Sequence, residues 1–314
     1  MKTLLIIGGT GFIGNCFIDF FKKNNCENFS ISKVILAGRN LSKIKYKKRL
    51  KTKNIFFKKI DLESKKIDFP QADYVIHAAE NYSNVIGKNN YNYKESYKFT
   101  KKISYHYNNT NYLSKLIFIS SGAVYGKNMK YKKITERNTV SLKKILKYKN
   151  FKVDYAKSKI KSETYLKKNF KSNFIIVRLF SVISSNVPKN KNFVIGNFLD
   201  DIKKKGEIKI KTLYPKKIFR SFIFYEDLVK IFIKLLNFDN KKGEVFNVGS
   251  SEGVSIYELS KIMSKYFEKK IFLQDKLNKS KISELDYYVP NIEKLKIKLK
   301  IKNLTNIRKS ISKL

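Results

Sequence analysis

Residues 7–15 read IGGTGFIGN and follow directly on a short apolar run, KTLLII, at residues 2–7. Such a run predicts a buried strand, and the next segment, FIGNCFIDFFKK, predicts a helix. Gly8, Gly11 and Gly14 therefore fall where a strand turns into a helix. Glycine permits the tight turn and lets the N–H groups of the helix start approach a phosphate. The stretch predicts a dinucleotide-binding loop, with a spacing that differs from the commonest G-x-G-x-x-G pattern.

Strand-like and helix-like patterns alternate along the first 180 residues. The strand-like runs are TLLII (3–7), KVILAG (33–38), NIFFKKI (54–60), DYVIHAA (73–79), KLIFISS (115–121) and NFIIVRLF (173–180). Strands joined by helical crossovers form parallel sheets that are covered on both faces. We therefore expect an α/β fold, with a Rossmann-like doubly wound parallel sheet in residues 1–180. Residues 181–314 are expected to form a smaller α/β part that binds substrate, with some segments returning to the first domain.

The composition excludes several classes of protein. The 314 residues carry a formal net charge of +43, but only six of the 68 basic residues are arginine and the lysines are scattered. We attribute this charge to a biased genome and expect no specific nucleic-acid partner. The two cysteines, Cys16 and Cys26, have no metal-ligand spacing and exclude a disulfide scaffold. No apolar run reaches the length of a membrane span, so a cytoplasmic protein is expected.

Two further residues bear on the dinucleotide. Asp61 ends a predicted strand, where its carboxylate could accept a hydrogen bond from the adenine amino group or could cap a helix. The tip of the second predicted strand reads ILAGRN and holds no carboxylate for the ribose hydroxyls of NAD. Arg39 in that segment offers a planar fork of donors to a 2′-phosphate. NAD and NADP both remain possible cofactors, and Arg39 favours NADP.

Three residues form a candidate catalytic group. The segment DYAKSK separates Tyr155 from Lys159 by four positions, which places both on one face of a helix. The run KLIFISSGAVYG brings Ser121 to the carboxyl end of the sheet. A nearby lysine ammonium favours the phenolate form of a tyrosine, whose ordinary pKa is about 10. Tyr155 could then exchange a proton with a sugar hydroxyl or carbonyl, while Ser121 holds the same oxygen.

These motifs together resemble the extended short-chain dehydrogenase/reductases, specifically the nucleotide-sugar epimerase/dehydratase family. The matching segments are GGTGFIG, VIHAAE, FISSGAVYG, YAKSK, IIVRLFSV, RSFIFYEDLV, FNVGSSEGVSIYEL and YVPNIEKLKIKL. The resemblance implies a cytoplasmic, homodimeric enzyme that acts on a nucleoside-diphosphate sugar. It implies that Ser121, Tyr155 and Lys159 are catalytic, and that Arg220 and Ser121 contact the substrate. The implied cofactor contacts are Gly8, Gly11, Phe12, Ile13, Gly14, Asp61, Leu62, Ala78, Ala79, Tyr155 and Lys159.

The sequence departs from the family pattern at several positions. The 4,6-dehydratases of the family carry Asp-Glu after the catalytic hydroxyl residue, where this chain has Gly122 and Ala123. Water elimination therefore lacks its acid and base. Ser181 replaces the asparagine of the R-x-x-N-V-Y-G-P pattern, which alters a substrate or nicotinamide contact, and Ser221 replaces an aspartate.

Three hypotheses follow from the sequence. The first is a nucleotide-sugar oxidoreductase, either a 4-epimerase that returns the hydride or a 4-ketoreductase that consumes NADPH. The second is a non-catalytic relative that senses a cofactor or binds nucleic acid, against which the retained Ser121, Tyr155 and Lys159 argue. The third is a reductase of a small carbonyl compound, against which Arg220 argues.

Overall fold

The computed structural model describes two compact units of the chain. The described residues are 2–43, 54–80, 82–85, 88–91, 93–110, 114–130, 132–138, 140–146, 151–188, 193–212, 214–273 and 285–314. The unit that we call the sheet unit takes residues 1–126, 139–179 and 229–246. The second unit takes residues 127–138, 180–228 and 247–314. The functional roles predicted for the two parts of the chain stay predictions.

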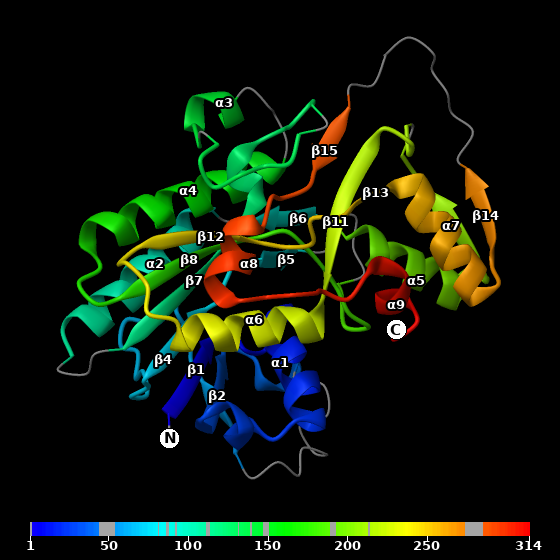
Figure 1. The fold of residues 1–314 in the computed structure, drawn as a ribbon. Coiled ribbons are helices and arrows are strands. Elements are labelled where there is room, and N and C mark those ends of the chain that lie inside the picture. The colour runs from blue at the N-terminus through cyan, green and yellow to red at the C-terminus, as the bar shows by residue number, and fades with distance from the viewer. Residues whose placement is uncertain are drawn as a thin grey trace. The chain divides into compact units, whose positions relative to one another are not determined.

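A seven-stranded sheet forms the centre of the sheet unit (Figure 1). Its strand order is β12-β8-β7-β4-β1-β2-β3, and each pairing from β3 to β8 is parallel. The strands are β1 (Lys2–Ile7), β2 (Ile31–Gly38), β3 (Ile55–Lys59), β4 (Tyr74–His77), β7 (Lys115–Ser121), β8 (Phe174–Leu179) and β12 (Glu244–Val248). The order reverses between β1 and β4, and in such sheets ligands bind beyond the carboxyl ends at this point.

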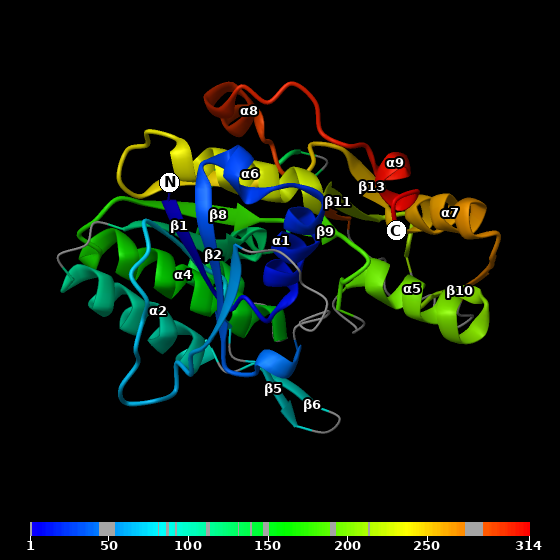
Figure 2. The same cartoon turned by 90° about the horizontal axis from the view of Figure 1, so that it is seen from below.

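Helices cover both faces of this sheet (Figures 1 and 2). Helices α2 (Tyr93–Asn108) and α4 (Phe151–Asn169) pack together on one face. Helix α1 (Phe12–Lys23) and the last part of α6 (Tyr225–Asn237) lie on the other, where the rings of Phe17 and Phe232 are 5.9 Å apart. The remaining elements of the sheet unit are η1 (Cys26–Phe29), η2 (Leu41–Lys43), β5 (Tyr82–Val85), β6 (Lys88–Tyr91), η4 (Gly122–Tyr125) and α3 (Leu142–Leu146).

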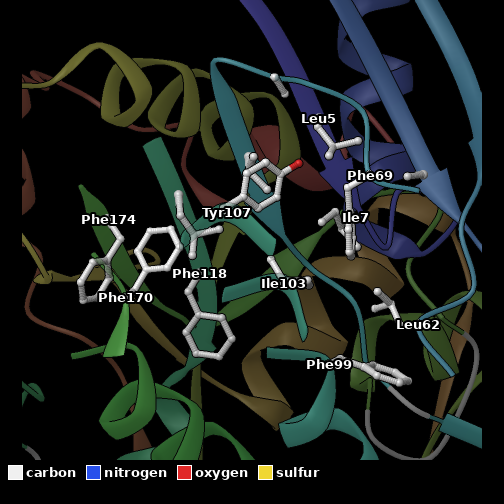
Figure 3. Close-up of a cluster of buried hydrophobic side chains, with 14 of the residues drawn as sticks. Leu5, Ile7, Leu62, Phe69, Phe99, Ile103, Tyr107, Phe118, Phe170 and Phe174 are labelled. Carbon is white, nitrogen blue, oxygen red and sulfur yellow. The ribbon is translucent and has the colours of Figure 1, made fainter. Parts of the chain in front are cut away.

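The core follows from the alternation of side chains along each strand. In β1, Leu5 and Ile7 enter the cluster that Figure 3 shows between the sheet and the α2/α4 layer. Leu4 and Ile6 are equally buried and point to the opposite face. Both sets are apolar because a parallel sheet is covered on both sides. Near one end of the cluster, the rings of Phe170 and Phe174 meet edge to face at 5.7 Å.

The second unit combines short strands with helices. Strand β11 (Ile218–Phe224) pairs in parallel with β9 (Ser181–Ile183) and β15 (Asp286–Tyr288), and antiparallel with β13 (Gly253–Ser255). A parallel pair joins β10 (Glu207–Ile210) to β14 (Lys270–Leu273). Its helices are α5 (Val194–Lys205), α7 (Ile256–Phe267), α8 (Glu293–Leu299) and α9 (Ile307–Ile311). A capping box between Ser255 and Glu258 begins α7.

The structure confirms the expected fold class, an α/β protein with a parallel central sheet. All six predicted strands of the first 180 residues are present. Cys16 is fully buried in α1, and both cysteines are free. In the described part of the chain, no helix is long and apolar enough to cross a membrane. The β5–β6 pair was not predicted, because YSNV and KNNY are largely polar and lack a strand pattern. The β10–β14 pair was also missed, although EIKI in β10 alternates polar and apolar residues.

The Phe17–Phe232 contact gives a test of the layered core. We expect Phe232→Ala to lower the free energy of unfolding by about 3–5 kcal/mol, because it removes a large buried side chain and leaves a cavity. Urea titration followed by circular dichroism measures the change. Phe56→Ala is the matched control, since the Phe56 side chain is 46% exposed. Equal losses in the two variants would contradict this description of the core.

Candidate active site

The predicted glycine loop lies between β1 and α1, at the carboxyl edge of the sheet. Gly8 has a φ of +89°, a conformation that L side chains rarely adopt. A Cβ on Gly8 would lie 2.6 Å from the backbone nitrogen of Ala79. The end of β4 therefore packs directly against the loop, and the N–H of Ala78 donates to the carbonyl of Ile7 at 2.8 Å. Only a residue without a side chain fits at Gly8.

The start of α1 packs closely against the same loop. A Cβ on Gly14 would lie 1.9 Å from the carbonyl oxygen of Gly9. Gly11 occupies the N-cap position, where no side chain caps the helix, and the first turn contains no acidic residue. An uncapped helix start without a carboxylate is suited to an anion. The loop thus fits the pyrophosphate of a dinucleotide, and Phe12 and Ile13 begin the helix beside it.

Asp61 and Leu62 follow β3 at the same edge. The Asp61 carboxylate accepts a hydrogen bond from the N–H of Glu63 at 3.0 Å, so it shapes the turn. Leu62 is buried and belongs to the core cluster of the sheet unit. Its carbonyl accepts a hydrogen bond from the Lys102 ammonium at 2.8 Å. These contacts fix the loop after β3; the adenine contacts of Asp61 and Leu62 stay predictions.

Arg39 follows β2 and has an acidic partner that the sequence did not reveal. Its Nη1 donates to Glu63 Oε1 at 2.8 Å, and both side chains are largely exposed. The N–H of Ile60 donates to the carbonyl of Gly38 at 3.1 Å, which aligns the ends of the two strands. The tip of β2 itself carries no carboxylate, as the sequence shows. A residue 24 positions further along the chain supplies one.

Ser121 ends β7 and is the N-cap of η4. Its Oγ accepts a hydrogen bond from the N–H of Ala123 at 3.2 Å, and the residue is buried. The hydroxyl of Ser120, the preceding residue of β7, donates to Glu163 Oε1 at 2.5 Å. Gly122 and Ala123, the positions of the dehydratase acid and base, form the first turn of η4 and carry no functional side-chain group.

Tyr155 and Lys159 lie one turn apart on α4. The Lys159 Nζ is 5.6 Å from the centre of the Tyr155 ring, which agrees with their predicted placement on one helix face. Lys159 is 2% exposed; its Nζ donates to the carbonyl of Ile119 at 2.5 Å and forms an ion pair with Glu80. The buried cation therefore has both a dipolar and an anionic partner, as a buried charge requires.

Arg178 and Glu163 form a second buried ion pair of the sheet unit. Arg178 on β8 donates from Nη2 to Glu163 Oε2 at 2.7 Å and from Nε to Oε1 at 3.1 Å. Its Nη1 donates to the Tyr125 hydroxyl at 2.9 Å. Together with Ser120, these residues join β7, β8, η4 and α4. Nearly every polar atom of the pair has a partner, which is the arrangement that makes a buried ion pair tolerable.

His77, at the end of β4, lies in the same buried region. Its Nε2 is 3.0 Å from the Thr100 hydroxyl, which donates to Ser162 Oγ at 3.0 Å. Among the residues that the structure describes, none forms a hydrogen bond with its Nδ1. Burial, with a smaller contribution from the Lys159 cation, lowers the pKa of His77 to about 3. The imidazole is therefore neutral in the folded protein at neutral pH.

The predicted substrate residues Arg220 and Ser181 belong to the second unit. Arg220 lies on β11, where its Nη2 donates to Asp286 Oδ2 at 2.5 Å and its Nη1 donates to the carbonyl of Phe219 at 2.7 Å. The guanidinium carbon is 5.7 Å from the centre of the Tyr288 ring. Ser181 begins β9 and pairs with Phe222. The carboxylate of Asp286 thus already accepts a hydrogen bond from one of the two terminal nitrogens of the Arg220 guanidinium.

Glu63, Glu80 and Asp286 are the residues that the sequence analysis missed. Each is an acidic side chain paired with a basic residue of the predicted site. Glu80 did carry a signal in the sequence, because it directly follows the predicted strand DYVIHAA at residues 73–79. In the part of the chain that the structure describes, no group of three or more His, Cys, Asp or Glu residues could hold a metal ion.

Comparison with known families identifies the family of the chain. The model of the NAD dependent epimerase/dehydratase family matches residues 4–249. The chain belongs to this family, and the resemblance drawn from its motifs is confirmed.

Individual relatives are more distant. A Methanocaldococcus jannaschii protein with the provisional name UDP-glucose 4-epimerase is 26% identical over 266 residues, which cover 83% of this chain and 81% of that protein. The UDP-N-acetylglucosamine 4-epimerase from Methanobrevibacter ruminantium M1 has 23% identity and a TM-score of 0.76, covering 99% of this chain and 96% of that one. The dTDP-glucose 4,6-dehydratase from Bacillus anthracis, solved with NAD, has 16% identity and a TM-score of 0.74, covering 99% and 94%.

The pKa of His77 predicts how stability depends on pH. Below pH 6.5 the unfolded chain gains a proton at His77, whereas the folded protein keeps it neutral until about pH 3. Stability is therefore lost as the pH falls through this window, by up to about 1.4 kcal/mol per pH unit from this residue. We expect His77→Gln to have a correspondingly flatter profile in urea titrations between pH 6.5 and pH 4.5.

His106→Gln is the matched control for this prediction. His106 lies on α2 and is only partly buried, so its removal should change the slope less. A slope in His77→Gln equal to that of the unchanged protein would show that His77 is not held neutral by burial.

Proposed function

We propose that this protein is a nucleoside-diphosphate-sugar 4-epimerase that uses a nicotinamide dinucleotide. The observation that carries the proposal is the buried Lys159 beneath the Tyr155 ring on α4, in a chain of this family. Ser121 ends the neighbouring strand β7, and the glycine loop lies at the same edge of the sheet. A relative over most of the chain that is provisionally named a 4-epimerase supports the same reaction.

The residues of the sheet unit fit the proposed cofactor. Gly8 and Gly14 leave no room for a side chain between the loop and its neighbours, so backbone N–H groups can approach a pyrophosphate. Phe12 and Ile13 supply the first N–H groups of α1, while Ala78 and Ala79 line the loop from β4. A bound nicotinamide ring supplies the hydride acceptor and donor for the sugar carbon. Both NAD and NADP are proposed as cofactors.

Tyr155 is proposed to remove the proton from the sugar 4-hydroxyl and later return it. A phenol is a weak base at neutral pH, so its phenolate needs a nearby positive charge. Lys159 provides that charge from a fixed position, because Ile119 and Glu80 hold its ammonium group. Glu80 offsets part of the charge, which keeps the buried cation stable. Ser121 would hold the same sugar oxygen by a hydrogen bond.

Arg220 is proposed to bind the diphosphate of the sugar nucleotide, to which Ser181 would add a polar contact. An arginine fork suits a diphosphate because it can donate two parallel hydrogen bonds. The diphosphate must then compete for the Arg220 guanidinium with Asp286, which accepts a hydrogen bond from it at 2.5 Å. Stacking near Tyr288 orients the guanidinium while it exchanges partners. A homodimeric assembly stays a prediction of the family resemblance.

A 4-ketoreductase is the second candidate, and Arg39 is the observation that favours it. A reductase consumes NADPH, whose 2′-phosphate an exposed arginine can bind. Dehydration is disfavoured, because Gly122 and Ala123 supply neither an acid nor a base.

A substrate screen tests the proposed reaction. The protein is incubated with a panel of nucleoside-diphosphate sugars and NAD or NADPH, and products are identified by NMR. We expect inversion at C4 for one sugar without net consumption of cofactor. Tyr155→Phe should lower kcat by about 100-fold or more, because it removes the proton carrier while keeping the ring. Net oxidation of NADPH would favour the reductase, and full activity of the Tyr155 variant would contradict the mechanism.

Arg220→Ala tests the substrate class separately. We expect binding of the sugar nucleotide to weaken about 10- to 100-fold, because a charge-assisted pair of hydrogen bonds is lost. Isothermal titration calorimetry measures sugar nucleotide and dinucleotide binding to the same protein. Arg308→Ala, in α9 of the second unit, removes an equal charge and is the matched control. If dinucleotide binding falls more than sugar nucleotide binding, Arg220 does not serve the substrate.

A further inference from the structure

The pair formed by Arg39 and Glu63 occupies the place where dinucleotide specificity is decided in folds of this class. Arg39 directly follows β2, and Glu63 follows β3 in the loop that begins at Asp61. The tip of β2 touches the glycine loop, because a Cβ on Gly38 would lie 2.6 Å from Thr10 Oγ1. In open parallel sheets, the residue beyond this strand reads the adenosine ribose.

Glu63 is held at this place by its backbone. Its N–H donates to Asp61 Oδ1 at 3.0 Å, and the N–H of Ser64 donates to the Asp61 carbonyl at 3.2 Å. The Lys102 ammonium donates to the carbonyls of Leu62 and Ser64, at 2.8 and 2.9 Å. Four hydrogen bonds therefore fix the loop, so the Glu63 side chain starts from a defined point beside Arg39.

We propose that Glu63 is a specificity residue that offsets Arg39 and makes the site favour NAD over NADP. This inference rests on the proposed function, because it assumes that the sheet unit binds a dinucleotide. A 2′-phosphate on the ribose would compete with the Glu63 carboxylate for Arg39 and would be repelled by it. A 2′-hydroxyl carries no charge and can donate to that same carboxylate.

The size of the effect follows from the exposure of the pair. The Arg39 and Glu63 side chains are 57% and 43% exposed, so solvent screens their interaction. An exposed ion pair of this kind changes an equilibrium by no more than about fivefold. Glu63 therefore shifts the preference between the two dinucleotides without excluding either of them. Within the described residues, Glu63 accepts a hydrogen bond from the Nη1 of Arg39 alone, so the other guanidinium donors are left for a ligand.

Dinucleotide titrations of Glu63→Gln test the proposal. Protein freed of any dinucleotide carried from expression is titrated with oxidised NAD and NADP by calorimetry. We expect the unchanged protein to bind NAD at least as tightly as NADP. In Glu63→Gln the affinity for NADP should rise about fivefold, with a change of less than about twofold for NAD. Arg39→Ala should weaken NADP binding. When Glu63→Gln is combined with Arg39→Ala, it should no longer change the affinity for NADP.

Asp68→Asn is the matched control. Asp68 forms an exposed ion pair with Lys58 in the same unit, so its removal changes the net charge equally. It should not change the ratio of the two affinities. If the ratio of the NADP and NAD affinities is unchanged in Glu63→Gln, or changes equally in Asp68→Asn, the proposed role of Glu63 is overturned while the proposed function stands. Failure of the unchanged protein and all variants to bind either dinucleotide would instead overturn the proposed function.

Discussion

The contact between Gly14 and Gly9 is the constraint on which the loop between β1 and α1 depends. With a Cβ position only 1.9 Å from the Gly9 carbonyl oxygen, α1 can begin where it does only because residue 14 has no side chain. The position of that helix start determines what its N–H groups can reach. The absence of a side chain at Gly8 likewise lets the loop pack directly against the residues that follow β4. The consecutive apolar residues 4–7 of β1 then anchor the loop in a core that is packed on both faces.

Buried charge organises the other half of the site. Glu163 and Arg178 tie α4 to β8, while Ser120 and Tyr125 bring β7 and η4 into the same network. Tyr155 and Lys159 lie on the helix that this network holds, and Ser121 follows Ser120 on the strand. The proposed proton transfer requires groups that are held within a fraction of an ångström, and buried, paired networks provide that rigidity. Glu80 adds a second anion beside Lys159.

Local patterns in the sequence predict most of this architecture, but they do not predict the pairing of charges. The strand runs, the glycine loop and the Tyr155–Lys159 spacing each depend on residues close together in the chain, so they could be read directly. Glu63 lies 24 positions from Arg39, and Glu80 lies 79 positions from Lys159. Their partners depend on strand order and loop path. The short β10 and β14 strands escaped prediction for a similar reason, since each depends on a distant partner.

The Arg178–Glu163 pair also has an evolutionary consequence. Both side chains are about 5% exposed, so replacing either one alone would leave an unpaired charge in the core. Such intermediates are strongly destabilised, whereas the simultaneous exchange of both residues for well-packed apolar ones can be neutral. Substitutions at these two positions, which lie 15 residues apart, are therefore tolerated only together. Among related chains they should be inherited as a linked pair, and a departure at position 163 should be accompanied by one at position 178.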